Sequence, residues 1–355
     1  MDNNTLSLFD VVEKFGLKAL SVRPIRGGLI NETFAVRTSS SGTWVLQAVN
    51  AIFAPEVQID IDHVTNHLRE KGMVSPKLRE TVDGNLWLEA DDKIWRMMSF
   101  IEGVSVNRAT SANHAREAGL ILGNFHLAMD DFEHDFHSQR PGIHDTERHL
   151  KHLRDSLADK SFKSHENHEA VSQCAEQIFA ISDRLEKLPK QEPRIVHGDP
   201  KISNIRYNRD TGKALCIVDL DTVGRMESLL ELGDAFRSWC NPAPSGEDEQ
   251  SPEFSMPLFD ASIKGYAKAT GDLLKPEEWQ AIPDATLMIC LELSSRFAAD
   301  ALHENYFGWN NAQFASRGEH NLIRANGQLR LAQSLDSQMD AARVIVKEAF
   351  DPEDS

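Results

Sequence analysis

Long apolar runs are missing from this 355-residue sequence, and cysteine is scarce. No stretch approaches the length of a membrane-spanning helix, and the first ten residues lack the basic and apolar parts of a secretory signal. The four cysteines stand far apart without a C-x-x-C pair, so buried thiols in a reducing cytosol are expected at Cys174, Cys216, Cys240 and Cys290. These absences predict a cytoplasmic protein with no membrane partner.

Positive charge is also in deficit, with 38 Lys and Arg residues against 55 Asp and Glu residues and a net charge of −17. Non-specific binding of nucleic acid needs a positively charged surface, so the composition argues against a nucleic-acid partner. Apolar residues make up 41% of the chain, which is enough to bury a substantial core. The length allows two domains or one large unit with two lobes.

The most informative polar residues lie in two short segments, HGDPKISN at 197–204 and IVDLD at 217–221. A strand pattern precedes the first segment, and two further short strands joined by a turn lie between the two segments. This hairpin should bring Asn204 close to Asp219, where two oxygen ligands suit an Mg²⁺ ion that also contacts substrate phosphates. Asp199 lies earlier in the loop and is predicted to accept a proton from a substrate hydroxyl.

A polar hairpin rich in turn residues is the simplest alternative, but turn chemistry does not require Asp, Asn and Asp at these offsets. The pattern H-x-D-x-x-x-x-N, followed by a strand that ends in Asp, resembles the catalytic loop and metal-binding strand of the protein-kinase-like fold. Gly198 stands where protein kinases carry Arg, and this form is similar to small-molecule kinases of the aminoglycoside phosphotransferase and choline kinase group. The resemblance implies ATP and Mg²⁺ as cofactors, with Asp199 as catalytic base and Asn204 and Asp219 as metal ligands.

Strand patterns dominate the first hundred residues, whereas the rest of the chain has mainly helical patterns. The sequence predicts a turn leading into a strand at 26–36, strands at 44–49 and 94–101, and a hairpin at 78–89. It predicts single helices at 55–71, 115–132 and 171–188, and closing helices within 322–350. The polar segment 241–257 is expected to be a mobile loop over the site. The predicted fold is α+β and bilobal, like that of protein kinases. Its strand-rich, nucleotide-binding N-lobe spans 1–103, and its helical C-lobe, which is catalytic and binds the substrate, spans 104–355.

Two glycines, Gly27 and Gly28, lie between the first strands, where a tight turn lets the backbone approach phosphates closely. Protein kinases place a Lys on the third strand to hold the α- and β-phosphates, whereas this sequence has Gln47 there. Gly27, Gly28 and Gln47 are the predicted nucleotide contacts. Either Mg²⁺ neutralises most of the phosphate charge, or another cation reaches in, for which Arg26 and Lys201 are candidates.

The sequence also resembles one branch of this group, the N-acetylhexosamine 1-kinases, which phosphorylate the anomeric hydroxyl of N-acetylglucosamine and N-acetylgalactosamine. This branch typically carries Gln on the third strand, as this sequence does at Gln47. The matching segments are 28–33, 45–50, 95–103, 141–146, 197–204, 214–222, 233–237, 296–300 and 306–307. The resemblance implies that the product is a sugar 1-phosphate.

A sugar pocket is consistent with the polar residues near these segments. A hexose offers many hydroxyls and little apolar area, so its pocket needs converging hydrogen-bond groups and an aromatic face. The predicted substrate contacts are Asn31, Asp199, Arg296 and Tyr306. The alternative for Arg296 is an ion pair within the lobe, and Asp234 and Arg237 are expected to form a structural pair that braces the loop.

Two other functions stay open at the level of the sequence. A kinase for an aminoglycoside, choline or an amino-alcohol needs an acidic or aromatic box, which the acidic residues 247–249 keep possible. A non-catalytic nucleotide-binding regulator would explain the missing Lys, but the intact set of Asp199, Asn204 and Asp219 argues against it.

Histidine is frequent between residues 126 and 168. His134 and His137, or His149 and His152, could share a helix face and bind a metal. The spacing supplies no Cys or carboxylate to complete a ligand set, so these histidines are predicted to be scattered surface and helix-end residues.

Overall fold

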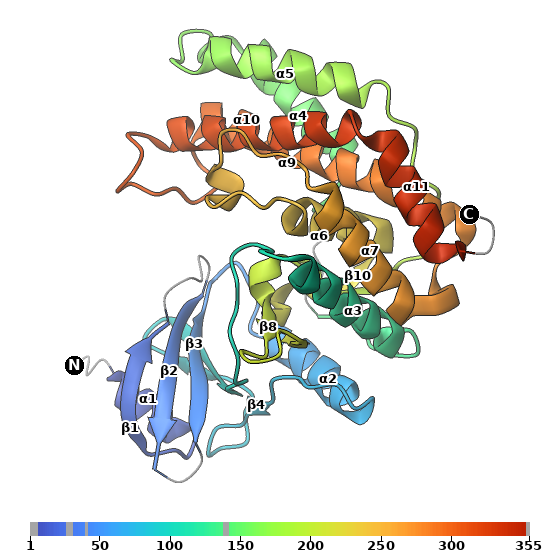
Figure 1. Cartoon of the computed structure of the whole chain (residues 1–355). Coiled ribbons are helices and arrows are strands. Elements are labelled where there is room, and N and C mark those ends of the chain that lie inside the picture. The colour runs from blue at the N-terminus through green and yellow to red at the C-terminus, as the bar shows by residue number, and fades with distance from the viewer. Residues whose placement is uncertain (1–5, 26–30, 40–41, 138–141, 353–355) are drawn as a thin grey trace.

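The computed structural model describes residues 6–25, 31–39, 42–137 and 142–352. A strand-rich part at the N-terminal side joins a larger helical part, and the second half of the chain builds most of the helices (Figure 1). The elements of the first part are α1 (Leu8–Lys14), β1 (Ala19–Pro24), β2 (Glu32–Thr38), β3 (Thr43–Val49), α2 (Val57–Glu70), β4 (Leu78–Arg79), β5 (Leu88–Ala90) and β6 (Lys93–Ser99).

The strands of this part form one antiparallel sheet in the order β1-β2-β3-β6-β4, with β5 also paired to β6. Alternate residues of β2, β3 and β6 turn toward α1, and Val36, Leu46 and Met97 are completely buried there. The predicted hairpin at 78–89 is wrong in its pairing. The two short strands β4 and β5 share the edge of β6 that β3 leaves free, so each pairs with β6 and not with the other.

Helix α2 follows the sheet in sequence but packs into the core of the helical part. Its predicted apolar face of Val57, Ile61, Val64 and Leu68 is buried against that core. Figure 1 shows α2 beside α3, below the main group of helices. The two parts of the molecule are therefore joined by packing as well as by the chain, and the division at residue 103 stays a prediction.

The other helices of the helical part pack around the long central helix α9 (Ile282–His303), most of whose residues are buried. Helices α4, α5 and α10 lie on the side of α9 away from the sheet, and α3 lies against α7 (Figure 1). The other helices are α3 (Ala112–Met129), α4 (Thr146–Ala158), α5 (His168–Ser182), α6 (Ser228–Trp239), α7 (Met256–Thr270), α8 (Pro276–Gln280), α10 (Arg317–Asp336) and α11 (Met339–Phe350).

The backbones of α3 and α7 touch because each helix has a glycine at the contact. A Cβ atom at Gly119 would lie 2.0 Å from the Ser262 carbonyl oxygen, and one at Gly265 would lie 2.1 Å from the Arg116 carbonyl oxygen. Any larger residue at either position would push the two helices apart.

The described helices and cysteines agree with two of the sequence predictions. Within the described residues no helix is both long and apolar enough to cross a membrane. The four cysteines are buried free thiols, as the sequence predicts.

Candidate active site

The catalytic loop lies between four short strands, β7 (Arg194–Val196), β8 (Ile205–Tyr207), β9 (Ala214–Ile217) and β10 (Gly224–Met226). As predicted, β8 and β9 form an antiparallel hairpin, while β7 pairs with β10. The Val218 N–H donates to the Asn204 carbonyl oxygen at 2.8 Å. The hairpin therefore brings the backbone of Asn204 beside the end of the strand that carries Asp219.

His197 anchors the start of this loop from inside the protein. Its side chain is completely buried, and its Nε2 atom lies 3.0 Å from the Val218 carbonyl oxygen. Its Nδ1 atom accepts the Asp199 N–H at 3.3 Å. These contacts require the proton to sit on Nε2. His197 is thus a structural link between the loop and the segment that follows β9.

Gly198 is required by its backbone as well as by its neighbours. Its φ is +83°, and a Cβ atom there would lie 2.3 Å from the Thr222 carbonyl oxygen. The Gly198 N–H donates to the buried Glu231 carboxylate at 2.7 Å, and Glu231 contacts His126, whose other ring nitrogen lies 2.8 Å from the Tyr266 hydroxyl. The sequence analysis missed this support, which comes from three different helices.

Three carboxylates gather at the end of the loop. Asp199 is contacted by the Lys201 ammonium at 2.5 Å and by the Asn204 amide nitrogen at 3.2 Å. Asp219 has a left-handed backbone, with φ 70° and ψ 57°, that is uncommon outside glycine. Burial and the neighbouring carboxylates of Asp221 and Asp199 raise the pKa of Asp219, against the opposing effect of Lys201 and Arg96. A divalent cation would relieve this repulsion, so the donor set fits a metal bound by oxygen ligands.

Arg96 on β6 joins the sheet to this carboxylate group, and the sequence analysis did not identify it. Its guanidinium makes two hydrogen bonds to the Asp221 carboxylate, one of them at 2.9 Å, and both side chains are at most 2% exposed. Arg96 also donates to the amide oxygens of Gln47 at 2.8 Å and Gln58 at 3.1 Å. A cation therefore lies directly opposite Gln47 in the sheet, at the neighbouring strand.

Two of the predicted contacts on the sheet side are used within this network. Asn31 donates from its amide nitrogen to Asp221 at 2.6 Å, and its amide oxygen accepts the Asn50 N–H at 2.9 Å. Gln47 donates to the Thr33 hydroxyl at 3.0 Å. The structure thus gives Asn31 and Gln47 structural partners, and their substrate and nucleotide contacts stay predictions. Gly27 and Gly28, like Arg26, lie outside the described residues.

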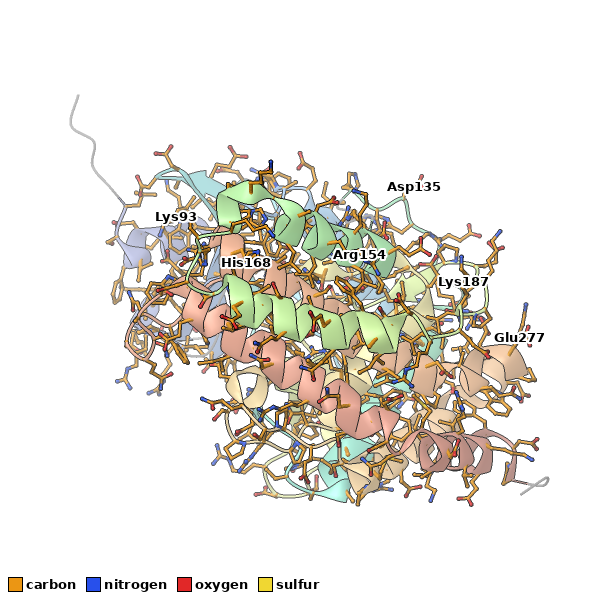
Figure 2. The ribbon with its side chains drawn as sticks, turned by 90° about the horizontal axis from the view of Figure 1, so that it is seen from above. Lys93, Asp135, Arg154, His168, Lys187 and Glu277 are labelled. Carbon is orange, nitrogen blue, oxygen red and sulfur yellow. The ribbon has the colours of Figure 1, made fainter. Side chains whose placement is uncertain are left out.

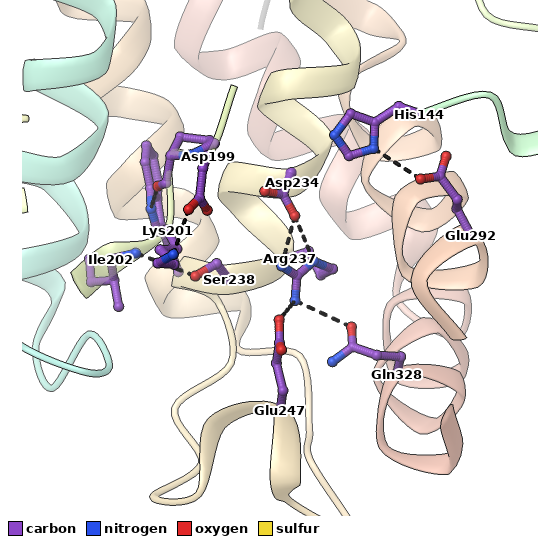
Figure 3. Close-up of polar contacts among 12 residues, drawn as sticks. His144, Asp199, Lys201, Ile202, Asp234, Arg237, Ser238, Glu247, Glu292 and Gln328 are labelled. Atoms are coloured by element: carbon purple, nitrogen blue, oxygen red, sulfur yellow. Dashed lines mark hydrogen bonds and ion pairs between the residues drawn. The ribbon is translucent and has the colours of Figure 1, made fainter. Parts of the chain in front are cut away.

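A second polar group lies on the helical side of Asp199 (Figure 3). Asp234 and Arg237 on α6 form the expected ion pair at 2.7 Å, and Arg237 also contacts Glu247 at 3.1 Å. Although burial opposes ionisation, Arg237 and His144 hold the pKa of Asp234 below its usual value. The segment 241–257, expected to be mobile, is anchored here by Glu247 and by Asp248, which contacts His320 and Arg324 at 2.8 Å each.

Arg296 and Tyr306 meet at the outer end of this group. The Arg296 guanidinium lies 3.4 Å from the Tyr306 hydroxyl, 3.6 Å from the Glu292 carboxylate and 5.5 Å from the centre of the Phe307 ring. Glu292 also accepts hydrogen bonds from His144 at 3.0 Å and Thr146 at 2.8 Å. Tyr306 is 66% exposed, so a ligand can reach it. The ion-pair alternative for Arg296 is therefore observed as a long contact of 3.6 Å.

The comparison with protein families identifies the chain. The family model described as "Phosphotransferase enzyme family" matches residues 21–269, which is more than half of the chain. The chain belongs to this phosphotransferase family. The catalytic loop lies inside the matched range, so the predicted activity, phosphate transfer with an alcohol group as acceptor, is confirmed at this level.

Solved structures of the same fold agree with the family. An amicoumacin kinase has a TM-score of 0.62 and 15% identity, with 92% of this chain and 93% of that chain covered. An aminoglycoside phosphotransferase from Alicyclobacillus acidocaldarius has a TM-score of 0.62 and 16% identity, over 96% and 98% of the two chains. A choline kinase from Cryptosporidium parvum has a TM-score of 0.54 and 13% identity, over 93% of each chain. The predicted bilobal fold is confirmed.

Proposed function

We propose that this phosphotransferase moves the γ-phosphate of ATP to a sugar hydroxyl, namely the anomeric hydroxyl of an N-acetylhexosamine, to give the sugar 1-phosphate. The observation that supports phosphate transfer is that the hairpin brings the end of β9, which precedes Asp219, beside the loop that carries Asp199 and Asn204. ATP is supported by solved structures of the same fold: the amicoumacin kinase is described in complex with AMP-PNP and Ca²⁺, and a spectinomycin phosphotransferase with ADP and its substrate.

Asn204 and Asp219 would hold Mg²⁺, which would neutralise charge on the phosphates when bound. Asp219 lies two residues after the end of β9 and has a left-handed backbone, and Arg96 holds Asp221 two residues further on. Arg96 would thus position the predicted metal ligand Asp219 indirectly, through Asp221. Arg96, the cation opposite Gln47, would therefore have a structural role and need not contact ATP.

Asp199 would accept the proton of the attacking hydroxyl. Lys201 balances its charge in the free protein, because the Asp199 and Asp219 carboxylates keep the pKa of Lys201 raised in spite of burial. An ammonium on a flexible stem can also contact the transferred phosphate, so Lys201 would partly replace the missing third-strand Lys.

The helical side of the site favours a sugar over a cationic alcohol. Arg296, Tyr306 and Phe307 offer a guanidinium and two aromatic rings, which suit a neutral polyhydroxylated ring. Two of the three acidic residues at 247–249 are already paired, Glu247 with Arg237 and Asp248 with Arg324. The resemblance of Gln47 and its neighbours to the N-acetylhexosamine 1-kinase branch supports the same choice.

A coupled assay of ADP release tests the proposal. The purified chain is given ATP and Mg²⁺ with N-acetylglucosamine, N-acetylgalactosamine, glucose, an aminoglycoside, choline or ethanolamine, and the Asp199→Asn variant serves as a blank. We expect the N-acetylhexosamines to give the highest kcat/KM. Turnover confined to choline, ethanolamine or an aminoglycoside would instead support the amino-alcohol or aminoglycoside alternative. No turnover with any acceptor would favour a nucleotide-binding regulator.

Product analysis then decides which hydroxyl accepts the phosphate. Coupling between phosphorus and H1 in the NMR spectrum of the product is expected for a sugar 1-phosphate. Coupling to H6 alone would reject the 1-kinase assignment but leave the roles of Asp199, Asn204 and Asp219 unchanged.

A further inference from the structure

Two histidines and a buried aspartate form a group remote in sequence from the catalytic loop. Asp60 on α2 is fully buried, whereas His134 and His137 come from the segment that follows α3. The Asp60 Oδ1 atom lies 2.8 Å from His134 Nε2 and 2.9 Å from His137 Nδ1. The three candidate ligand atoms all lie within 4.8 Å of one another. The carboxylate therefore does not come from the sequence around the two histidines, because the fold brings Asp60 to them from a distant helix.

We propose that Asp60, His134 and His137 bind a zinc ion. Two imidazoles and one carboxylate are a ligand set that proteins use for Zn²⁺, whereas Mg²⁺ and Ca²⁺ prefer sites made of oxygen atoms only. Zinc ligands lie about 2.0–2.2 Å from the ion, so the three atoms need only separate slightly to surround it. Water would complete a four-coordinate site.

The present hydrogen bonds are compatible with this role. Each histidine that donates to Asp60 carries its proton on the nitrogen that faces the carboxylate. To bind zinc, each neutral imidazole would move that proton to its other ring nitrogen, so the two lone pairs could point at the ion. The His137 backbone N–H, which lies 3.1 Å from both Asp60 oxygens, can keep its hydrogen bond and orient the carboxylate.

Aromatic side chains cover one side of the three-residue group, and the other side faces solvent. The rings of Phe132 and Phe136 lie 5.8 Å and 4.9 Å from the His134 ring. His137 is 43% exposed, and Figure 2 shows Asp135, between the two histidines, at the outer edge of the molecule. An ion can therefore enter from solvent and be held against an apolar wall.

The site would fix α2 to the segment after α3. Gln58 lies two residues before Asp60 on the same helix, and its amide oxygen accepts from Arg96, which also holds Asp221. Zinc would therefore have a structural role separate from phosphate transfer. It would hold in place the helix α2, whose Gln58 accepts a hydrogen bond from Arg96.

Zinc binding is measured on the full chain by competition with a chromogenic chelator, in millimolar Mg²⁺ so that the carboxylates of the catalytic loop are occupied. We expect one Zn²⁺ per chain and a rise in Tm on zinc addition. The double variant His134→Gln/His137→Gln should weaken zinc binding by on the order of 100-fold or more, because it removes two direct ligands. The matched control, His149→Gln/His152→Gln, carries the same change at a second histidine pair with the same spacing and should bind zinc like the unmodified chain.

Asp60→Asn is the second variant, because its amide oxygen can still accept the histidine protons in the folded protein while it is a poor zinc ligand. Circular dichroism confirms that each variant is folded. Replacement of Zn²⁺ by Co²⁺ should give a visible absorption spectrum of tetrahedral type that both site variants lose. Absence of stoichiometric zinc binding, or equal binding by the site variants and the control, would overturn the proposal.

Discussion

Arg96 and Arg296 both lie beside a buried carboxylate, yet their surroundings give them different roles. Arg96 is almost completely buried, and its donors are shared among Asp221, Gln47 and Gln58. The Arg296 side chain is 13% exposed and lies 3.6 Å from Glu292, whose oxygens already accept two shorter hydrogen bonds. An arginine whose donors are used inside the protein positions other groups. One whose protein contacts are long can exchange them for contacts with a ligand.

Replacement of Asp199, the predicted catalytic base, should have the largest effect on turnover. Asp199→Asn should lower kcat by on the order of 10²–10⁴, because it removes the general base. Steady-state kinetics with the acceptor found by the screen measures this change. Asp210→Asn, at an exposed position in the β8–β9 turn, is the control and should retain activity. Turnover of Asp199→Asn within tenfold of the unmodified enzyme would remove the base assignment.

The same substitution at the two arginines tests the comparison directly. Arg96→Met should lower the free energy of unfolding by about 3–5 kcal/mol, because Asp221 would keep a buried charge with only the neutral Asn31 amide, among the described residues, as its hydrogen-bond donor. Arg296→Met should cost less than this, because its contact to Glu292 is long, at 3.6 Å, and Glu292 keeps its shorter hydrogen bonds from His144 and Thr146. Urea unfolding at neutral pH gives both values. Similar losses at the two positions would show that Arg296 is structural too.

Arg296→Ala should act on the acceptor and not on the nucleotide. A hydrogen bond from a charged group contributes about 1.5–3 kcal/mol, so the KM for the sugar should rise roughly tenfold to a hundredfold while the KM for ATP stays unchanged. Arg154→Ala, on the exposed side of α4, is the matched control. An equal rise in the KM for ATP would place Arg296 on the nucleotide side instead.

The sequence predicts the parts of the site that are local in the chain. The catalytic loop and its hairpin span fewer than thirty residues, so residue spacing alone predicts that Asn204 and Asp219 come together. Arg96, Glu231 and Asp60 were not found, because their partners are far away in sequence: Arg96 and Asp221 are 125 residues apart. An arginine between the apolar residues 94–95 and 97–98 of β6 is the signal that could have identified Arg96.

His144 offers a pH-dependent test of the helical side. Burial alone would lower the pKa of His144, but the Glu292 carboxylate raises it above the usual value of 6.5. The pair therefore stabilises the fold fully below the unfolded pKa, and that contribution is lost as the pH rises through the higher pKa of the folded protein.

His144→Gln should consequently lose more unfolding free energy at pH 6 than at pH 9, relative to the unmodified chain. Urea unfolding at the two pH values gives the difference, and His149→Gln is the control because it lacks the Glu292 hydrogen bond. An equal loss of unfolding free energy at pH 6 and pH 9 would contradict a charged His144–Glu292 pair.

Gln47 should give the smallest effect and the finest test of the sheet side. Its amide accepts from Arg96 and donates to Thr33, and Arg96 keeps both hydrogen bonds to Asp221 when Gln47 is removed. Gln47→Ala should therefore weaken ATP binding by about three- to tenfold, the effect of a hydrogen bond worth roughly 0.5–1.5 kcal/mol. Calorimetric titration with a non-hydrolysable ATP analogue and Mg²⁺ measures it, and Gln47→Glu provides the contrast.

The Gln47→Glu carboxylate can still accept from Arg96, but it places a negative charge near the predicted phosphate site, so it should bind the nucleotide more weakly than Gln47→Ala. Equal affinities for the two variants would mean that the phosphates lie far from this strand, and that Arg96 and Gln47 serve only to hold Asp221.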